Sequence, residues 1–331
     1  MNSRRSYAVA MLSALKRIGS KVGGHLWSTL PVIRPNRAGW IEAHSTWKTV
    51  DVATAQHADT TIEGLYASPP SADTLVLVIP GLGADAESPY CQELAADLYS
   101  QGYASLRLNL AFSPHAPPDF RRDGFTDDLD AILGDARFEH FEDVFLLGFS
   151  LGAHAALRAC CRHPSPRRVK AVALINGALD LAAIQVHMDS PGQAVYRKFF
   201  LDLVRTQYKT FSQEGRCTPY DPMFDDLNRL HEIDRALLKL QGKTTSLEKN
   251  YQEISAITVL EKLTLPTLLL AAPNDPIIPF ASVALGQSPK YPTIDFRQLP
   301  GGHIYGPRVA DIGELPNAPL ISEIMHWYEG R

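Results

Sequence analysis

The sequence contains few cysteines and no long apolar run, and both absences narrow the classes of protein to which it can belong. Its 331 residues include four cysteines, Cys91, Cys160, Cys161 and Cys217, without any C-x-x-C spacing. This pattern predicts neither a disulfide framework nor a zinc site, and it favours a reducing compartment, which predicts a cytoplasmic location. No segment approaches the roughly 18 consecutive apolar residues that a membrane-spanning helix requires.

An excess of positive charge is also missing over the whole chain, in which 32 Lys and Arg stand against 36 Asp and Glu and the formal net charge is −4 at pH 7. No global basic field is present that would attract nucleic acid, so no nucleic-acid partner is predicted. The first 41 residues differ, because they contain no Asp or Glu but seven Lys or Arg. Residues 1–23 form a basic N-terminal segment, and two interpretations stay open: peripheral contact with an anionic membrane surface, or an ordinary N-terminal helix.

Short apolar runs alternate with helical periodicity along most of the chain. Residues 47–66 are rich in Thr, Val and Ala without helical spacing, which indicates edge strands. The core strands are predicted at 74–79, 104–110, 144–147, 169–175 and 267–272, with a last, more exposed strand at 294–299, and helices at 89–101 and 127–137. Strands that alternate with helices predict an α/β fold with a mostly parallel central sheet flanked by helices.

The alternation stops between Asn176 and Lys262. Apolar residues there recur at helical spacing with charges between them: Tyr196, Phe199, Phe200, Leu203, Val204, Leu227, Leu230, Ile233, Leu237 and Leu240. We expect a helical insertion over the active edge of the sheet. Its apolar stripes either pack on the core, line an acyl-binding surface, or do both as a lid.

Residues 144–157 read as a short apolar strand, the pattern G-x-S-x-G, and then an Ala- and Leu-rich helix. This context is typical of the sharp strand-to-helix turn that carries a serine nucleophile, and it makes Ser150 the candidate. Gly148 and Gly152 are expected because side chains at these positions would collide with the neighbouring strand and helix.

A serine hydroxyl needs a base that accepts its proton, and the base needs a carboxylate that orients it. In hydrolases with this turn the three follow in the order Ser, acid, His, near the ends of strands. The strand at 267–272 ends before Asp275, our candidate acid, and the last strand ends before His303, our candidate base. Each residue alone could be an ordinary turn or loop residue, and the ordered coincidence of three is what predicts a triad.

Acyl transfer also requires backbone N–H donors for the oxyanion that develops on the substrate. Their positions after the nucleophile and in the first strand-to-helix loop predict the amides of Leu151 and Leu82. The loop at 80–85 matches neither a dinucleotide-binding nor a P-loop pattern, and His231-Glu232 lacks the second histidine of a zinc motif. No cofactor and no metal are predicted.

These motifs together resemble the α/β-hydrolase superfamily and, within it, the YheT-like branch that includes the mammalian ABHD hydrolases. The resemblance runs from about residue 25 to the C-terminus and rests on His25–Trp27, Leu30–Pro31, Pro80–Leu82, Ser88–Tyr90, Thr126–Leu129, Gly148–Gly152, Leu179–Ala182 and Asn274–Pro276. It implies Ser150, Asp275 and His303 as the triad of an esterase or lipase-like enzyme. Two positions depart from the pattern: Pro80 stands where the family usually has His, and residues 109–112 replace an Arg-Gly-containing loop.

The sequence therefore predicts an α/β-hydrolase fold with a helical lid inserted before the acid-bearing strand. The expected organisation is a basic segment at 1–23, a hydrolase core at 24–176 and 263–331, and a lid at 177–262. The predicted function is a serine hydrolase that cleaves carboxylic esters of medium-chain or lipid-like type. Two alternatives stay open, an acyltransferase that forms esters from an alcohol and a non-catalytic binding protein that retains the fold.

Overall fold

The computed structural model describes residues 41, 43–54, 57–109, 126–162, 168–215, 217–240, 242–299, 302–303 and 320–331. The predicted basic segment, the His25–Trp27 and Leu30–Pro31 motifs and most of the departing loop after Asn109 lie outside these residues. The predicted acid, base and nucleophile all lie within them.

One sheet organises the described part of the chain, in the order β1-β2-β4-β3-β5-β6-β7-β8. Its strands are β1 Thr46–Thr54, β2 His57–Ala67, β3 Thr74–Ile79, β4 Ala104–Asn109, β5 Asp143–Phe149, β6 Val169–Ile175, β7 Thr267–Ala271 and β8 Ile294–Gln298. β1 pairs antiparallel with β2 and β2 antiparallel with β4, whereas the pairs from β4 to β8 are parallel. The predicted mostly parallel sheet is confirmed.

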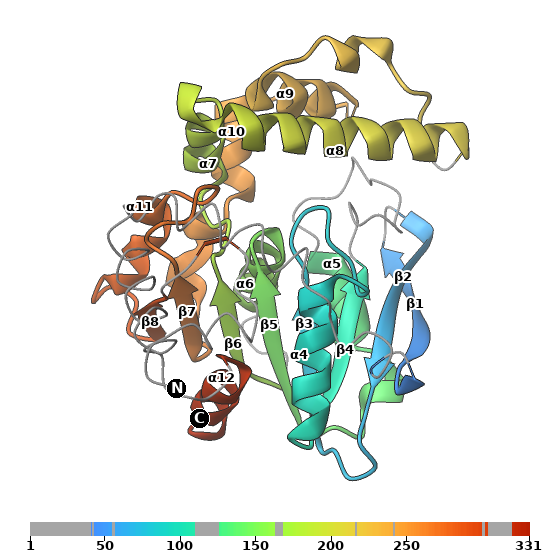
Figure 1. The fold of residues 1–331 in the computed structure, drawn as a ribbon, viewed down its shortest axis with the longest axis vertical. Coiled ribbons are helices and arrows are strands. Elements are labelled where there is room, and N and C mark those ends of the chain that lie inside the picture. Colours follow the sequence, from blue (N-terminus) through green and yellow to red (C-terminus); the bar gives the residue numbers. More distant parts are fainter. Residues whose placement is uncertain are drawn as a thin grey trace, which may run out of the picture.

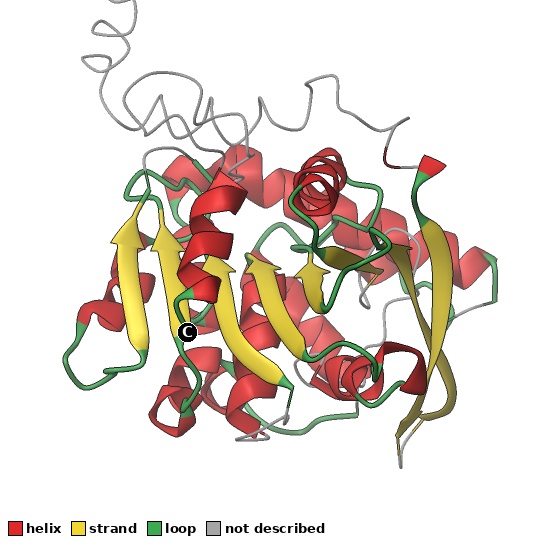
Figure 2. Cartoon of the chain, turned by 90° about the horizontal axis from the view of Figure 1, so that it is seen from below, coloured by secondary structure: helices red, strands yellow, loops and turns green. Residues whose placement is uncertain are grey.

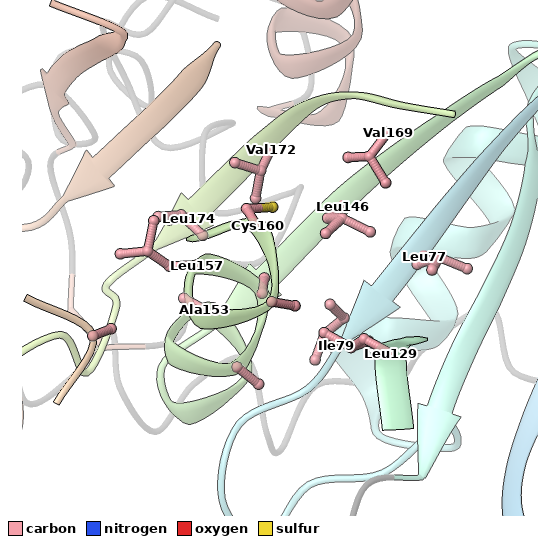
Figure 3. Packing of buried hydrophobic residues seen from close by; sticks show 14 of the residues in the cluster. Leu77, Ile79, Leu129, Leu146, Ala153, Leu157, Cys160, Val169, Val172 and Leu174 are labelled. Carbon is pink, nitrogen blue, oxygen red and sulfur yellow. The ribbon is translucent and has the colours of Figure 1, made fainter. Parts of the chain in front are cut away.

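β3, β5, β6 and β7 are apolar along most of their length because helices cover both faces of the sheet. Leu77, Ile79 and Leu146 face one side and pack with residues of α6 such as Leu157 (Figure 3). The residues between them, such as Val78 and Leu147, face the other side. β8, at the edge of the sheet, is only half-buried, as the sequence predicts.

Helices α4 (Pro89–Ser100) and α12 (Leu320–Glu329) pack on one face, and α5 (Thr126–Leu133) and α6 (Leu151–Arg162) on the other (Figure 2). The predicted single helix at 127–137 is wrong in its last turn. α5 ends at Leu133, Gly134 and Asp135 follow, and a separate 3₁₀ helix η1 covers Ala136–Phe138. The Asp135 carboxylate accepts the N–H of Arg137 at 2.9 Å and so caps the N-terminus of η1. This cap favours a separate helix at η1 over an extension of α5.

The segment between β6 and β7 is helical, as expected, and lies across the C-terminal ends of the parallel strands (Figure 1). It contains α7 Leu181–Met188, η2 Pro191–Gln193, α8 Ala194–Gln213, η3 Pro222–Asp225, α9 Leu230–Leu240, α10 Leu247–Ile254 and η4 Ala256–Lys262. After β7 come α11 Phe280–Val283 and η5 Ala284–Gln287. We call the residues from α7 to η4 the insertion.

The insertion has a small apolar core of its own. Tyr208 of α8 is fully buried against Phe224 of η3 and Ile233 of α9. The ring centroids of Tyr208 and Phe224 lie 5.1 Å apart in an edge-to-face arrangement. Part of the predicted apolar stripe therefore packs within the insertion itself. No helix in the described ranges combines the length and the apolar character that crossing a membrane requires.

Candidate active site

Ser150 occupies the turn between β5 and α6 with a backbone φ of 51°. This left-handed conformation is strained for a non-glycine residue, and surrounding hydrogen bonds hold it. The Ser150 N–H donates to the carbonyl of Ile175 at 3.0 Å, and its own carbonyl accepts the N–H of Ala178 at 3.0 Å. The strained turn is therefore fixed to the end of β6.

Gly148 and Gly152 allow the chain to make this turn. A Cβ atom at Gly152 would lie 2.2 Å from the carbonyl oxygen of Ile79, and one at Gly148 would lie 2.6 Å from the Cα of Ala153. Both contacts are to backbone atoms, which cannot move aside. The sequence-based argument for these two glycines is confirmed.

Asp275 and His303 form a buried pair beyond β7 and β8. The Nδ1 atom of His303 lies 2.8 Å from Asp275 Oδ2, and the two side chains are 9% and 1% exposed for His303 and Asp275 respectively. The second oxygen of Asp275 accepts the N–H groups of Ile277 at 2.8 Å and Ile278 at 3.0 Å. The carboxylate is thus held in one orientation, and it can fix the imidazole in the tautomer that is protonated at Nδ1 and has its acceptor lone pair on Nε2.

Asn176, the residue directly after β6, connects this pair to the nucleophile turn. Its Nδ2 group donates to the carbonyl oxygens of Gly302 and His303, each at 2.9 Å. Its Oδ1 atom accepts the N–H of Ala272, directly after β7, at 2.8 Å. The side chain is 1% exposed and the backbone φ is 45°, a value that Asn adopts more readily than most residues. Asn176 therefore sets the position of the His303 backbone relative to the ends of β6 and β7.

The loop after β3 passes directly over Ser150. A Cβ atom at Gly81 would lie 3.0 Å from Ser150 Cβ. The Gly81 N–H donates to the hydroxyl of Tyr90 at 3.2 Å, whereas no acceptor within the described ranges takes the N–H of Leu82. Leu151 is the first residue of α6, so its N–H has no partner within the helix. Leu82 and Leu151, the predicted oxyanion donors, therefore both lie beside the Ser150 turn, and no residue that the structure describes accepts a hydrogen bond from either amide.

The two departures from the family pattern fall around this same loop. Pro80 is buried at the end of β3. Asn109, the last residue of β4, accepts the N–H of Ala86 with its Oδ1 at 2.8 Å, and the buried Arg107 donates to the Ala86 carbonyl at 2.8 Å. Side chains of β4 thus hold the loop after β3, and Tyr90 braces it from α4.

A cavity of about 270 Å³ lies between Ser150 and the insertion. Leu82, Ser150, Leu151, His154, Ala178, Ile277 and Ile278 form its wall on the sheet side. Leu181, Ile184, Met188, Phe200, Val204, Leu230, Ile233, Asp234, Leu237, Leu238, Asn250, Tyr251 and Ile254 form its wall on the insertion side. Part of the predicted apolar stripe therefore faces this cavity, in addition to the part that packs within the insertion.

His154 contributes an imidazole to the wall of this cavity. It lies on α6, is 1% exposed, and its Nδ1 atom lies 3.2 Å from the carbonyl oxygen of Ala178. Burial lowers the pKa of His154 from 6.5 to about 3, and the nearby Arg158 acts in the same direction. The ring is therefore neutral throughout the physiological pH range.

The predicted site residues thus fall into two groups. Ser150, Leu82 and Leu151 share the cavity wall, and Asp275 and His303 share a hydrogen bond. Asn176, Tyr90 and His154 were not singled out from the sequence. A lone Asn or Tyr carries no pattern, although His154 follows the G-x-S-x-G motif by two residues and could have been noticed there.

Comparison with known proteins agrees with this geometry. The profile of the alpha/beta hydrolase fold family matches residues 74–304, which include β3, the nucleophile turn, the insertion and His303. The chain belongs to the α/β hydrolase fold family. The superfamily expected from the motifs is confirmed.

Individual relatives are distant. The protein named "Putative esterase YheT" of Escherichia coli (strain K12) is 21% identical over 238 residues, which cover 69% of each chain. This match supports the predicted YheT-like branch. Among solved structures, the Pyrococcus furiosus esterase Pf2001 superposes with a TM-score of 0.56 at 13% identity, covering 88% of this chain and 94% of its own. The esterase EaEST of Exiguobacterium antarcticum gives 0.52 at 15% identity, with 85% and 99% covered. At these identities the structures support the fold.

Proposed function

We propose that this α/β hydrolase cleaves carboxylic esters with Ser150 as nucleophile, His303 as base and Asp275 as the acid that orients the base. The observation that carries the proposal is the buried 2.8 Å contact between His303 Nδ1 and Asp275 Oδ2. An oriented imidazole beside a carboxylate is what a weak hydroxyl nucleophile requires. YheT, Pf2001 and EaEST are all named as esterases, which supports the same reaction class.

In the proposed reaction, Nε2 of His303 accepts the proton of the Ser150 hydroxyl while Oγ attacks the ester carbonyl carbon. The carbonyl oxygen becomes an oxyanion, and the amides of Leu82 and Leu151 donate hydrogen bonds to it. The imidazolium then protonates the departing alcohol, and the acyl group stays on Ser150. Water attacks this acyl-enzyme with His303 again as base, which releases the acid and restores the serine.

His303 fits the role of base better than His154 does. A base in this reaction must carry a positive charge after it takes the serine proton, and Asp275 stabilises that charge on His303. In the described part of the chain the hydrogen-bond partner of His154 is a carbonyl oxygen, and a pKa of about 3 means that burial strongly disfavours its charged form. We assign His154 to the cavity wall.

The proposed substrate class follows from the cavity. Ten of its thirteen lining residues from the insertion are apolar, which suits a hydrocarbon chain. Its volume of about 270 Å³ lies near the lower end of the ligand-pocket range of roughly 300–1,000 Å³. We therefore propose a medium-chain ester, with residues 177–262 acting as a lid over the hydrolase core.

The proposal is tested by labelling with a fluorophosphonate probe and by the turnover of p-nitrophenyl esters of increasing acyl length. Ser150→Ala should lose both labelling and turnover, and Asp275→Asn should lower kcat by as much as about 10⁴-fold because the imidazole loses its orienting carboxylate. Ser100→Ala, an exposed serine at the end of α4, is the matched control and should behave as the natural protein.

Three results would contradict this function. Labelling that survives in Ser150→Ala would place the nucleophile elsewhere. Ester formation that exceeds hydrolysis when an alcohol is added would make the enzyme an acyltransferase. Folded protein that neither reacts with the probe nor turns over any ester would be a binding protein that retains the fold.

A further inference from the structure

The insertion side of the cavity carries one group of polar side chains in an otherwise apolar wall. Asn250 and Tyr251 lie on α10 and Asp234 lies on α9. Asn250 is 6% exposed, and its Oδ1 atom has no hydrogen-bond partner among the described residues. A buried acceptor without a donor is unfavourable, so its retention in a ligand-sized cavity calls for a donor that arrives with the ligand.

Asp234 adds a second acceptor beside Asn250. Its Oδ2 atom accepts the hydroxyl of Tyr251, and within the described ranges no donor is bonded to its other oxygen. Burial raises the pKa of Asp234 to about 6, and the charge of Asp189 adds to this, while the Tyr251 hydroxyl and His231 act in the opposite direction. Near neutral pH the group is therefore mainly an acceptor in a poorly hydrated place.

We propose that Asn250 and Asp234 form a subsite that binds a hydroxyl group on the chain of the substrate, some distance from the ester that Ser150 attacks. This rests on the proposed ester hydrolase and names its substrates as hydroxylated esters. The subsite and the nucleophile line the same cavity from opposite walls, so one chain can reach both.

The chemistry of the subsite favours a neutral hydroxyl over charged groups. A carboxylate on the ligand would be repelled by Asp234. An ammonium group would leave water for a single carboxylate that already accepts the Tyr251 hydroxyl, and the desolvation of such a cation is costly. A hydroxyl loses much less on leaving water and donates one hydrogen bond to an acceptor that otherwise has none.

The length of the chain decides whether one substrate can reach both groups. The cavity volume of about 270 Å³ is close to the lower end of the range for ligand pockets, so the test uses short and medium chains. Hexanoate, octanoate and decanoate esters are compared to find the length that places a terminal hydroxyl at Asn250 while the carbonyl lies at Ser150.

The first experiment compares p-nitrophenyl esters of these acids with the same esters carrying a terminal hydroxyl. A matched series places the hydroxyl on the alcohol part of the ester instead, and it compares octyl butanoate with the monobutanoate ester of octane-1,8-diol. We expect kcat/KM to be about tenfold higher for the hydroxylated member of at least one series, as one hydrogen bond to a buried polar group produces. Ratios within twofold in both series would overturn the subsite.

Asn250→Leu removes the amide at similar volume and should erase the difference in kcat/KM between the hydroxylated and the unsubstituted esters. Asn228→Leu makes the same change at an exposed position and is the control, which should keep the natural preference. A hydroxyl preference that persists in Asn250→Leu would show that this residue does not bind the group.

Binding to Ser150→Ala protein separates this inference from the proposed reaction, since no turnover is required. We expect octane-1,8-diol to bind about tenfold more tightly than octanol in calorimetry. In the same Ser150→Ala background, Asn250→Leu should make the affinities of the two alcohols equal. This result would support the subsite even if no ester is cleaved. Equal binding of the two alcohols, or tighter binding of 8-amino-octanol than of the diol, would overturn it.

Discussion

Replacing Asn176 by Asp tests whether one amide positions His303, the proposed base. The carboxylate introduced by this change would still accept the Ala272 N–H, and Asp tolerates the left-handed backbone nearly as well as Asn. It would donate no hydrogen bond to the carbonyl oxygens of Gly302 and His303, which Asn176 Nδ2 contacts at 2.9 Å each. The change therefore removes the two bonds to the histidine loop and keeps the third.

The magnitude follows from these two bonds. Each buried hydrogen bond contributes about 1 kcal/mol, so their loss costs about 2 kcal/mol. If this free energy is lost from the transition state, kcat/KM falls about 30-fold, because about 1.4 kcal/mol corresponds to a factor of ten. Asn176 does not line the cavity, so kcat should fall while KM stays within about threefold.

The assay measures kcat and KM with p-nitrophenyl octanoate, and the free energy of unfolding in urea, for the natural protein and Asn176→Asp. Asn228→Asp, at an exposed position whose amide donates to the Asp226 carbonyl, is the control for the chemical change alone. An Asn176→Asp enzyme whose stability falls by about 2 kcal/mol but whose kcat stays within threefold would refute the positioning argument. It would show that His303 keeps its place without this amide.

Two further predictions concern groups around the nucleophile. Because the folded-state pKa of His154 is about 3 against 6.5 for the free side chain, the stability it contributes is fully present above pH 6.5 and is lost as the pH falls from 6.5 towards 3. Between pH 7.5 and 4.5 the natural protein should lose about 2–3 kcal/mol more unfolding free energy in urea than His154→Gln, and equal losses would contradict this. Tyr90→Phe removes the acceptor of the Gly81 N–H and should lower kcat several-fold with little change in KM. Tyr103→Phe, whose hydroxyl bonds Glu329 at the other end of the sheet, is the control, and equal kcat values for the two variants would contradict the bracing role.

Local patterns predicted the sheet well. β3 and β6 begin and end at the predicted residues, because a mostly apolar stretch of six or seven residues suits a strand buried on both faces, even though Lys170 of β6 is exposed. The helix after residue 126 was predicted too long, because apolar spacing continues past the point where Gly134 and the Asp135 cap end it. The spacing of apolar residues indicates which side chains are buried, whereas the residue at which a helix ends depends on capping.

The candidate site also contains some residues that sequence patterns indicate and others that only the structure reveals. Ser150, Asp275 and His303 could be named because they follow recognisable strands in an expected order. Asn176 could not, because its role rests on hydrogen bonds to Gly302 and His303, 126 and 127 residues further along the chain. Asn250 was equally invisible, since an unpartnered amide oxygen in a cavity wall becomes apparent only when the surrounding atoms are in place.

The insertion leaves the sheet after β6 and returns at β7, and these two strands are neighbours, with Ile175 paired to Leu270. The gap that the segment must close is therefore fixed by the sheet and does not depend on the length of the segment. Each doubling of the length of a flexible connection costs only about 0.6 kcal/mol in closure entropy. The insertion can thus be replaced by a segment of another length or sequence without moving β6 and β7. Such a replacement would change which substrates fit the cavity, while Ser150, Asp275 and His303, the proposed reacting groups, lie outside the replaced segment.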